Sequence, residues 1–178
     1  MAVGIGLGSA PGAAATSEVQ PPPNVPTGLR VPAGAKPIAR LHATGAQVYK
    51  CAATGGAYTW TLQRPDAILH DATGAAVGTH GAGPAWTSKD GSAVVGAKVE
   101  QAPAPVASAV PWLLLRATST SGRGLFSGVT FVQRFDTKGG MPPAGGCDAS
   151  HAGAENRASY SADYYFYSGG GASKEGRP

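Results

Sequence analysis

The chain has 178 residues, of which only 13% are charged, and it contains 27 glycines and 15 prolines. This length suits one domain with a hydrophobic core and is short for two. The net charge of +4 comes from basic residues scattered along the chain, which argues against nucleic-acid binding, because such a surface needs lysines and arginines grouped on one face.

Residues 1–27 are predicted to be a signal-peptide remnant followed by a disordered segment. They are rich in alanine, glycine and proline and end in QPPPNVP, a composition that buries too little apolar surface to become ordered. A short apolar stretch followed by an alanine-rich run is typical of a shortened secretory signal. No run approaches the eighteen or so apolar residues of a membrane span. We therefore expect a secreted or periplasmic protein without a membrane span.

A glycine-rich motif, GIGLGSAPG, lies within this N-terminal segment and imitates a nucleotide-binding loop. Such a loop works only between a strand and a helix, with an acidic residue about twenty positions further on. Here no strand precedes the motif and prolines follow it. The sequence therefore predicts no cofactor.

Short strands separated by turns follow over residues 28–168, the predicted domain. AQVYKCA and YTWTLQ flank an ATGG turn and predict a hairpin over 46–63, with Tyr58, Trp60 and Leu62 on one face. AILHD and AAVGTH predict a second hairpin around an ATG turn, and SAVVGAKVEQA follows the KDG turn as a longer strand.

The second half of the domain continues the same pattern. WLLLRATS reads as a strand buried on both faces, with a helix of one or two turns between Ala104 and Leu115 as the alternative. Two more strands are predicted in GLFSGVTFVQRFDT and ASYSADYYFYSG, and residues 169–178 are expected to form a flexible tail. About eight to ten short strands indicate an all-β sandwich or barrel.

The stretch LHDATGAAVGTHGAGPAWTSKDGS, residues 69–92, holds the first candidate site. His70, Asp71 and His80 could converge across the second hairpin, and imidazole and carboxylate groups bind zinc or carry out acid/base chemistry. No HxH or HExxH spacing places two ligands on one face. The commoner alternative is that His80 and Pro84 fix a tight loop while Trp86 fills the core beneath it.

The aromatic residues give a second candidate. In YSADYYFY, Tyr165 and Tyr167 share one face and are the candidates for exposure, with Tyr164 and Phe166 buried. Exposed aromatic rings stack on sugars, so this face suggests binding to polysaccharide or cell-surface material. Gln133, Arg134 and Asp136 are placed at a strand end, where Arg134 and Asp136 could form an ion pair that pins a loop.

Cys51 and Cys147 are the two cysteines, and they lie far apart in the sequence without a CxxC motif. They are too few for a structural zinc site, which needs four ligands at tight spacing. A disulfide in an oxidising compartment is the favoured use, and two buried free thiols are the alternative.

The ordered series YKC, YTWTLQRPDAILHDATGAAVGTHGAGPAWTSKDGS, PWLLLRAT, GLFSGVTFVQRFDTKGGMPPAGGC and YSADYYFY resembles the secreted domain-of-unknown-function family 3455, over about residues 25–168. The resemblance implies an exported protein with the Cys51–Cys147 pair and no established activity. Its characteristic positions would be Trp60, Pro65, Gly78, His80, Gly83, Pro84, Trp86, Gly91, Ser92, Trp112, Gln133, Arg134, Thr137, Gly139 and Gly140.

The expected function is therefore a non-catalytic binding or surface-associated module. The alternatives are a metal-assisted or acid/base enzyme centred on His80, and a structural or stress-related secreted protein. The candidate binding residues are His80, Trp86, Gln133, Arg134, Tyr165 and Tyr167, and the candidate metal ligands are His80, His70 and Asp71. The sequence does not indicate an oligomeric state.

Overall fold

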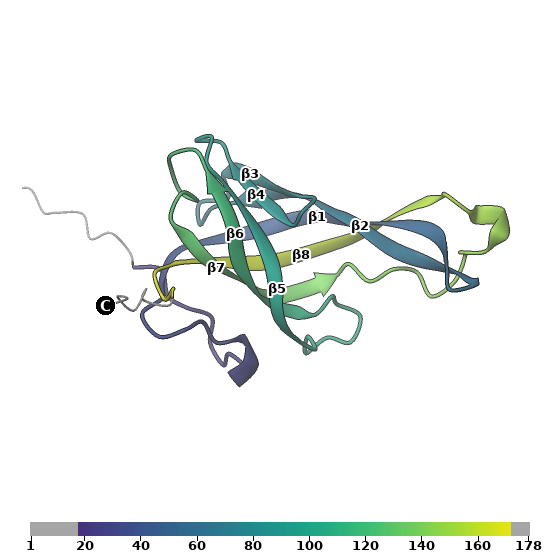
Figure 1. Ribbon diagram of the computed structural model, residues 1–178, viewed down its shortest axis with the longest axis horizontal. Coiled ribbons are helices and arrows are strands. Elements are labelled where there is room, and N and C mark those ends of the chain that lie inside the picture. The colour runs from purple at the N-terminus through teal and green to yellow at the C-terminus, as the bar shows by residue number, and fades with distance from the viewer. Residues whose placement is uncertain (1–17, 172–178) are drawn as a thin grey trace, which may run out of the picture.

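The computed structural model describes residues 18–171 as a single antiparallel sheet of eight strands that closes into a barrel (Figure 1). The predicted signal remnant and most of the predicted tail lie outside the described residues. The strands are β1 (Lys36–Thr54), β2 (Ala57–His70), β3 (Ala76–Gly81), β4 (Ala85–Ser88), β5 (Ala93–Ala102), β6 (Trp112–Ser121), β7 (Val129–Gly139) and β8 (Glu155–Ser168). The all-β prediction is confirmed, with a barrel rather than a sandwich.

Helical structure is limited to two 3₁₀ turns, η1 (Thr27–Leu29) and η2 (Ala149–His151), and residues 18–171 contain no α-helix. The alternative of a helix between Ala104 and Leu115 is therefore wrong, because the chain enters β6 at Trp112. Within the described part of the chain, no helix has the length and apolar character needed to cross a membrane.

Each strand pairs with the next one along the chain, and β1 also pairs with β8 to close the ring. The β1–β8 ladder is long, with partners from Lys36 and Ser168 to Lys50 and Glu155. Because successive side chains of a strand point to opposite faces, closure gives each strand one inward and one outward set.

The inward set forms the main hydrophobic core. It includes Leu41, Leu69, Trp86, Leu115 and Tyr164, each almost fully buried. A second cluster lies on the outer face of β6, β7 and β8 and contains Leu114, Phe131, Phe135, Tyr165 and Tyr167. Apolar side chains on both faces explain the continuous WLLL run that the sequence analysis assigned to a strand buried on both sides.

The N-terminal strap, residues 18–35, covers this outer cluster. Leu29 in η1 is fully buried against it, and Val25 and Val31 pack beside Leu29. The Gln133 amide nitrogen donates a hydrogen bond to the Leu29 carbonyl. Residues 18–27 were expected to be disordered, but the structure gives them a defined course because the barrel supplies the apolar partner that the segment lacks by itself.

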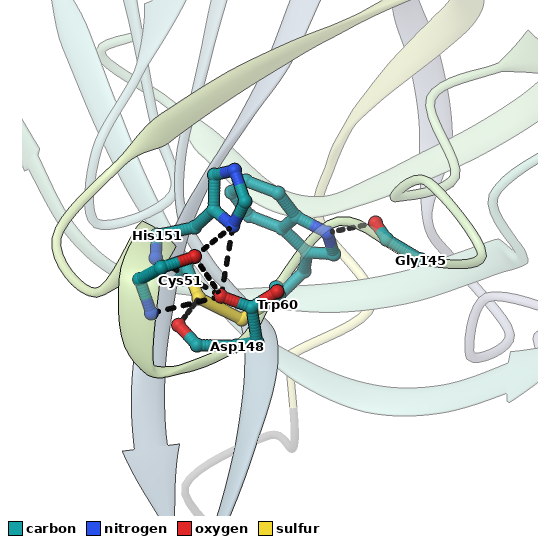
Figure 2. The surroundings of a disulfide bond; sticks show 7 residues. Cys51, Trp60, Gly145, Asp148 and His151 are labelled. Carbon is teal, nitrogen blue, oxygen red and sulfur yellow. Dashed lines mark hydrogen bonds and ion pairs between the residues drawn. A yellow bond between two sulfur atoms is a disulfide. The ribbon is translucent and has the colours of Figure 1, made fainter.

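The β1–β2 hairpin extends beyond the barrel together with the disulfide loop, residues 140–154 (Figure 1). Cys51 and Cys147 form a disulfide with Cα atoms 5.4 Å apart, as predicted. Figure 2 shows further contacts of the disulfide loop: Trp60 Nε1 donates to the Gly145 carbonyl at 2.9 Å, and Asp148 caps η2 by accepting from the backbone of Ser150 and His151. The loop is thereby fixed to one face of the hairpin.

Replacing Leu29 by alanine tests whether the strap is part of the folded domain. A buried leucine truncated to alanine costs about 2 to 5 kcal/mol of unfolding free energy. We expect a loss in this range in urea denaturation. Val99→Ala, at a side chain that is 54% exposed, is the control and should change stability by less than about 0.5 kcal/mol. Equal effects of the two substitutions would contradict the docked strap.

Removing the disulfide tests its contribution to stability. Cys51 and Cys147 are 96 residues apart, and closing so long a loop stabilises a fold by roughly 4 to 5 kcal/mol in the chain-entropy model. The Cys51→Ser/Cys147→Ser variant should therefore have a markedly lower urea midpoint than the oxidised protein. A reductant should shift the midpoint of the parent protein and leave that of the variant unchanged. A urea midpoint that responds neither to the double substitution nor to the reductant would contradict a stabilising Cys51–Cys147 disulfide.

Candidate functional site

The barrel contains an interior pocket of about 590 Å³. Its buried polar and aromatic lining comprises Gln47, Tyr49, His80, Trp86 and Tyr164, joined by the half-buried Arg134. Its exposed rim includes Leu62 from the β1–β2 hairpin and Met141 from the disulfide loop. The pocket therefore lies at the end of the barrel from which the hairpin and loop extend.

His80 and Trp86 enter this pocket from the β3–β4 hairpin. They are cross-strand partners, and their rings are stacked with centroids 4.5 Å apart. His80 Nδ1 is 2.8 Å from the Ala85 carbonyl across the turn. An added Cβ on Gly96 would approach Trp86 Cζ3 to 3.2 Å, so glycine there leaves room for the indole. The structural alternative for this stretch, a tight loop above a buried tryptophan, is confirmed.

The His80 ring is neutral over the physiological pH range. Burial, and to a smaller extent the charge of Arg134, lowers the pKa of His80 to about 3, although the hydrogen bond to Ala85 acts in the opposite direction. A carbonyl oxygen can only accept, so Nδ1 carries the proton and Nε2 presents a lone pair. Within residues 18–171, Nε2 has no hydrogen-bond partner. His80 thus offers one acceptor in an otherwise donor-rich pocket.

Arg134 projects inward from β7. Its Nε and one Nη donate to the Pro111 carbonyl at 3.0 and 2.7 Å, and it forms no ion pair with any described residue. The predicted Arg134–Asp136 pair is wrong, because β7 has an irregularity between Phe135 and Lys138 and Asp136 adopts φ 48°. Asp136 lines a different pocket from Arg134.

Two further donors in the pocket are buried without a partner. Gln47 Nε2 and Trp86 Nε1 make no hydrogen bond among the described residues. Leaving a buried donor unsatisfied costs about 1 to 3 kcal/mol. Gln47 is held in place by close packing, since a Cβ on Gly140 would come within 3.2 Å of its Cγ. The Tyr49 hydroxyl fixes the same segment by donating to the Gly140 carbonyl at 2.7 Å.

His70 and Asp71 do not join His80. They line a separate open pocket of about 720 Å³ with Arg40, His42 and Asp163. His70 Nε2 is 3.2 Å from Thr44 Oγ1, and the Asp71 carboxylate accepts hydrogen bonds within its own turn. Along the β2–β3 ladder, His80 faces Ala67 rather than His70. Residues 18–171 contain no group of three His, Cys, Asp or Glu side chains placed to hold a metal.

Tyr165 and Tyr167 are not exposed, which corrects the predicted aromatic surface. They point outward, away from the interior-facing Tyr164 and Phe166, but are only 3% and 2% exposed because the N-terminal strap covers that face. Gln133 lies with them: its side-chain oxygen accepts from the Tyr167 hydroxyl at 2.6 Å. Of the predicted binding residues, the structure brings His80, Trp86 and Arg134 into one pocket and places Gln133, Tyr165 and Tyr167 beneath the strap.

Comparison with known families identifies the chain. Residues 32–168 match the family described as protein of unknown function (DUF3455). The chain belongs to this family. No curated protein and no solved structure matches this DUF3455 domain. Several positions that the sequence resemblance marks as characteristic line the interior pocket, namely Pro65, His80, Gly83, Pro84, Trp86 and Arg134.

Gln47, Tyr49 and Tyr164 were not among the predicted site residues. Gln47 and Tyr49 lie on the inward face of β1, next to Cys51, and are buried. A glutamine that alternates with apolar residues in a predicted strand was the available signal for Gln47, because a buried amide needs a specific partner. Tyr164 was correctly predicted to be buried, but nothing in its strand indicated that it borders a pocket.

The pH dependence of stability tests the state of His80. Its folded pKa of about 3 lies below the unfolded value of 6.5, so between these values the unfolded chain binds one more proton and stability falls as the pH decreases through 6.5. Between pH 4.5 and 6, we expect the slope of the unfolding free energy against pH to be larger in the parent protein than in His80→Phe by about 1.4 kcal/mol per pH unit. Parallel curves would contradict a buried neutral His80.

Proposed function

We propose that this DUF3455 domain is a non-catalytic binding module that takes one small organic molecule into the interior pocket. The observation that supports this most directly is the pair of buried, unpartnered donors on Gln47 and Trp86. A fold gains nothing from such groups by itself, whereas a ligand that accepts hydrogen bonds would satisfy them.

The shape and composition of the pocket support a small ligand. A volume of about 590 Å³ falls within the usual range of ligand pockets, about 300 to 1,000 Å³. Val110, Leu113 and Leu115 supply apolar walls, and a few polar groups lie among them. Because Tyr165 and Tyr167 are covered, we place any sugar or cell-wall fragment in this interior pocket rather than on the outer surface.

The lining residues favour binding over catalysis. They include no serine, threonine, cysteine, aspartate or glutamate. The lowered pKa of His80, about 3, makes it a weak base. The remaining titratable lining residues are tyrosines, arginines and Lys98, and Lys98 lies at the exposed rim. The pocket therefore offers chiefly hydrogen bonds and apolar contact.

We further propose that the domain acts outside the cytoplasm, as a secreted or periplasmic protein. The disulfide between Cys51 and Cys147 supports this, because such bonds persist in oxidising compartments. The bond also holds the loop that carries Met141 at the rim, so the same compartment that keeps it oxidised would maintain the pocket.

Filling the pocket tests the proposal. Phenol, benzyl alcohol and benzoate at millimolar concentration serve as probes in saturation-transfer NMR with the disulfide-bonded full chain. We expect at least one of them to bind the parent protein and binding to be lost in Leu113→Trp, whose larger side chain would occupy the pocket. Ile68→Trp, at a side chain that is 48% exposed, is the matched control and should retain binding.

Two results would contradict the proposal. The first is that none of the probes binds the parent protein. The second is that a probe binds the Leu113→Trp variant as well as it binds the Ile68→Trp control, which would place the binding outside the interior pocket.

A further inference from the structure

The charge of the interior pocket is unbalanced. Its lining residues include three cationic side chains, Arg64, Lys98 and Arg134, and no carboxylate. At the rim, Arg64 lies 3.7 Å from the exposed Glu155, and the Lys98 ammonium donates to Gln101 at 3.1 Å. Arg134 donates to a neutral partner, the Pro111 carbonyl, and forms no ion pair among the described residues. Among the described residues, Arg134 and Lys98 both lack a counter-ion, and Arg134 is the half-buried one while Lys98 lies exposed at the rim.

The positive charge of Arg134 acts on groups from several strands. Burial is the main cause of the raised pKa values of Tyr49, Tyr160 and Tyr164, and in each case the charge of Arg134 opposes that rise. The same charge disfavours protonation of His80. An anion placed among these side chains would meet a positive potential and no carboxylate.

The uncharged donors favour the same kind of ligand. Gln47 Nε2 and Trp86 Nε1 are buried without an acceptor, and both residues are only 1% exposed. A guanidinium has five N–H groups, and Arg134 donates through its Nε and one Nη to Pro111, so donors remain on its other Nη. Carboxylate oxygens accept several such bonds, and charge-assisted bonds of this kind are the strongest available.

We propose that the ligand of the interior pocket is a small organic monoanion, a carboxylic acid in its ionised form, whose carboxylate binds Arg134 and the neighbouring donors. One uncompensated guanidinium matches one negative charge. The apolar walls then contact the uncharged body of the acid. This inference rests on the proposed binding function and adds the chemical class of the ligand.

Isothermal titration calorimetry with three probes of one ring size tests the inference. Benzoate, benzyl alcohol and phenyl phosphate are titrated into the disulfide-bonded full chain at pH 7.5. We expect benzoate to bind at least tenfold more tightly than benzyl alcohol, the gain typical of a hydrogen bond to a charged group. We also expect benzoate to bind more tightly than phenyl phosphate, because Arg134 is the one half-buried cation without a counter-ion among the described residues and the second negative charge would have to reach Lys98 at the exposed rim.

Two variants show whether Arg134 is responsible. Arg134→Gln should reduce the ratio between the dissociation constants of benzyl alcohol and benzoate to near one. Arg116→Gln, at an exposed arginine over the Phe131 ring on the outer face, is the matched control and should leave the ratio unchanged. Gln47→Glu places a carboxylate beside the donors and should abolish benzoate binding. A cooperative thermal transition shows whether this variant folds, and if it does it decides the question where Arg134→Gln does not fold.

The outcomes separate this inference from the proposed function. If benzyl alcohol binds in the pocket as tightly as benzoate, the binding function stands and the anion assignment is wrong. Tighter binding of phenyl phosphate would replace the carboxylate by a phosphate ester. Unchanged benzoate binding in Gln47→Glu would also overturn the inference. If none of the three probes binds, the proposed function itself fails.

Discussion

The pairing of β1 with β8 is the constraint on which the rest of the structure depends. It joins the first and last strands of the sheet along a ladder from Lys36 and Ser168 to Lys50 and Glu155. Closure removes both sheet edges and creates an enclosed interior. The same ladder extends beyond the barrel into the hairpin, where the disulfide fixes the loop at the pocket rim. Sheet closure and pocket formation thus share one set of backbone hydrogen bonds.

Strand alternation was sufficient to predict the all-β class, the hairpins and the division of YYFY between two faces. It could not predict that the outer face would be covered. Tyr165 and Tyr167 point outward as expected but pack beneath the N-terminal strap, whose composition suggested disorder. Both errors have one physical cause, because the strap becomes ordered only against the aromatic face and that face is buried only by the strap. Neither local sequence contains this long-range information.

The candidate site shows the same division between local and long-range information. His80, Trp86 and the turn between them form a local unit, which the glycines and Pro84 made recognisable. Arg134 was noticed for its charge but assigned to a local ion pair, because the irregularity that turns Asp136 away from it has no sequence signal of its own. Gln47 and Arg134 line one pocket because β1 and β7 both pair with β8, so the role of Gln47 depends on topology rather than on spacing.

The polar lining has an energetic cost that the rest of the molecule offsets. Two unsatisfied buried donors cost about 1 to 3 kcal/mol each, and leucines in their place would satisfy the fold better. The disulfide stabilises by roughly 4 to 5 kcal/mol in the chain-entropy model, and Leu29 adds a fully buried contact on the opposite face of the sheet. The stabilising features lie at the extension and the outer face. Of the three buried donors without a partner among the described residues, those of Gln47 and Trp86 line the interior pocket, and the third, Trp112 Nε1, lies beside the outer cluster. Two of the three costly groups thus lie where a ligand could satisfy them, as a binding site built into a stable barrel requires.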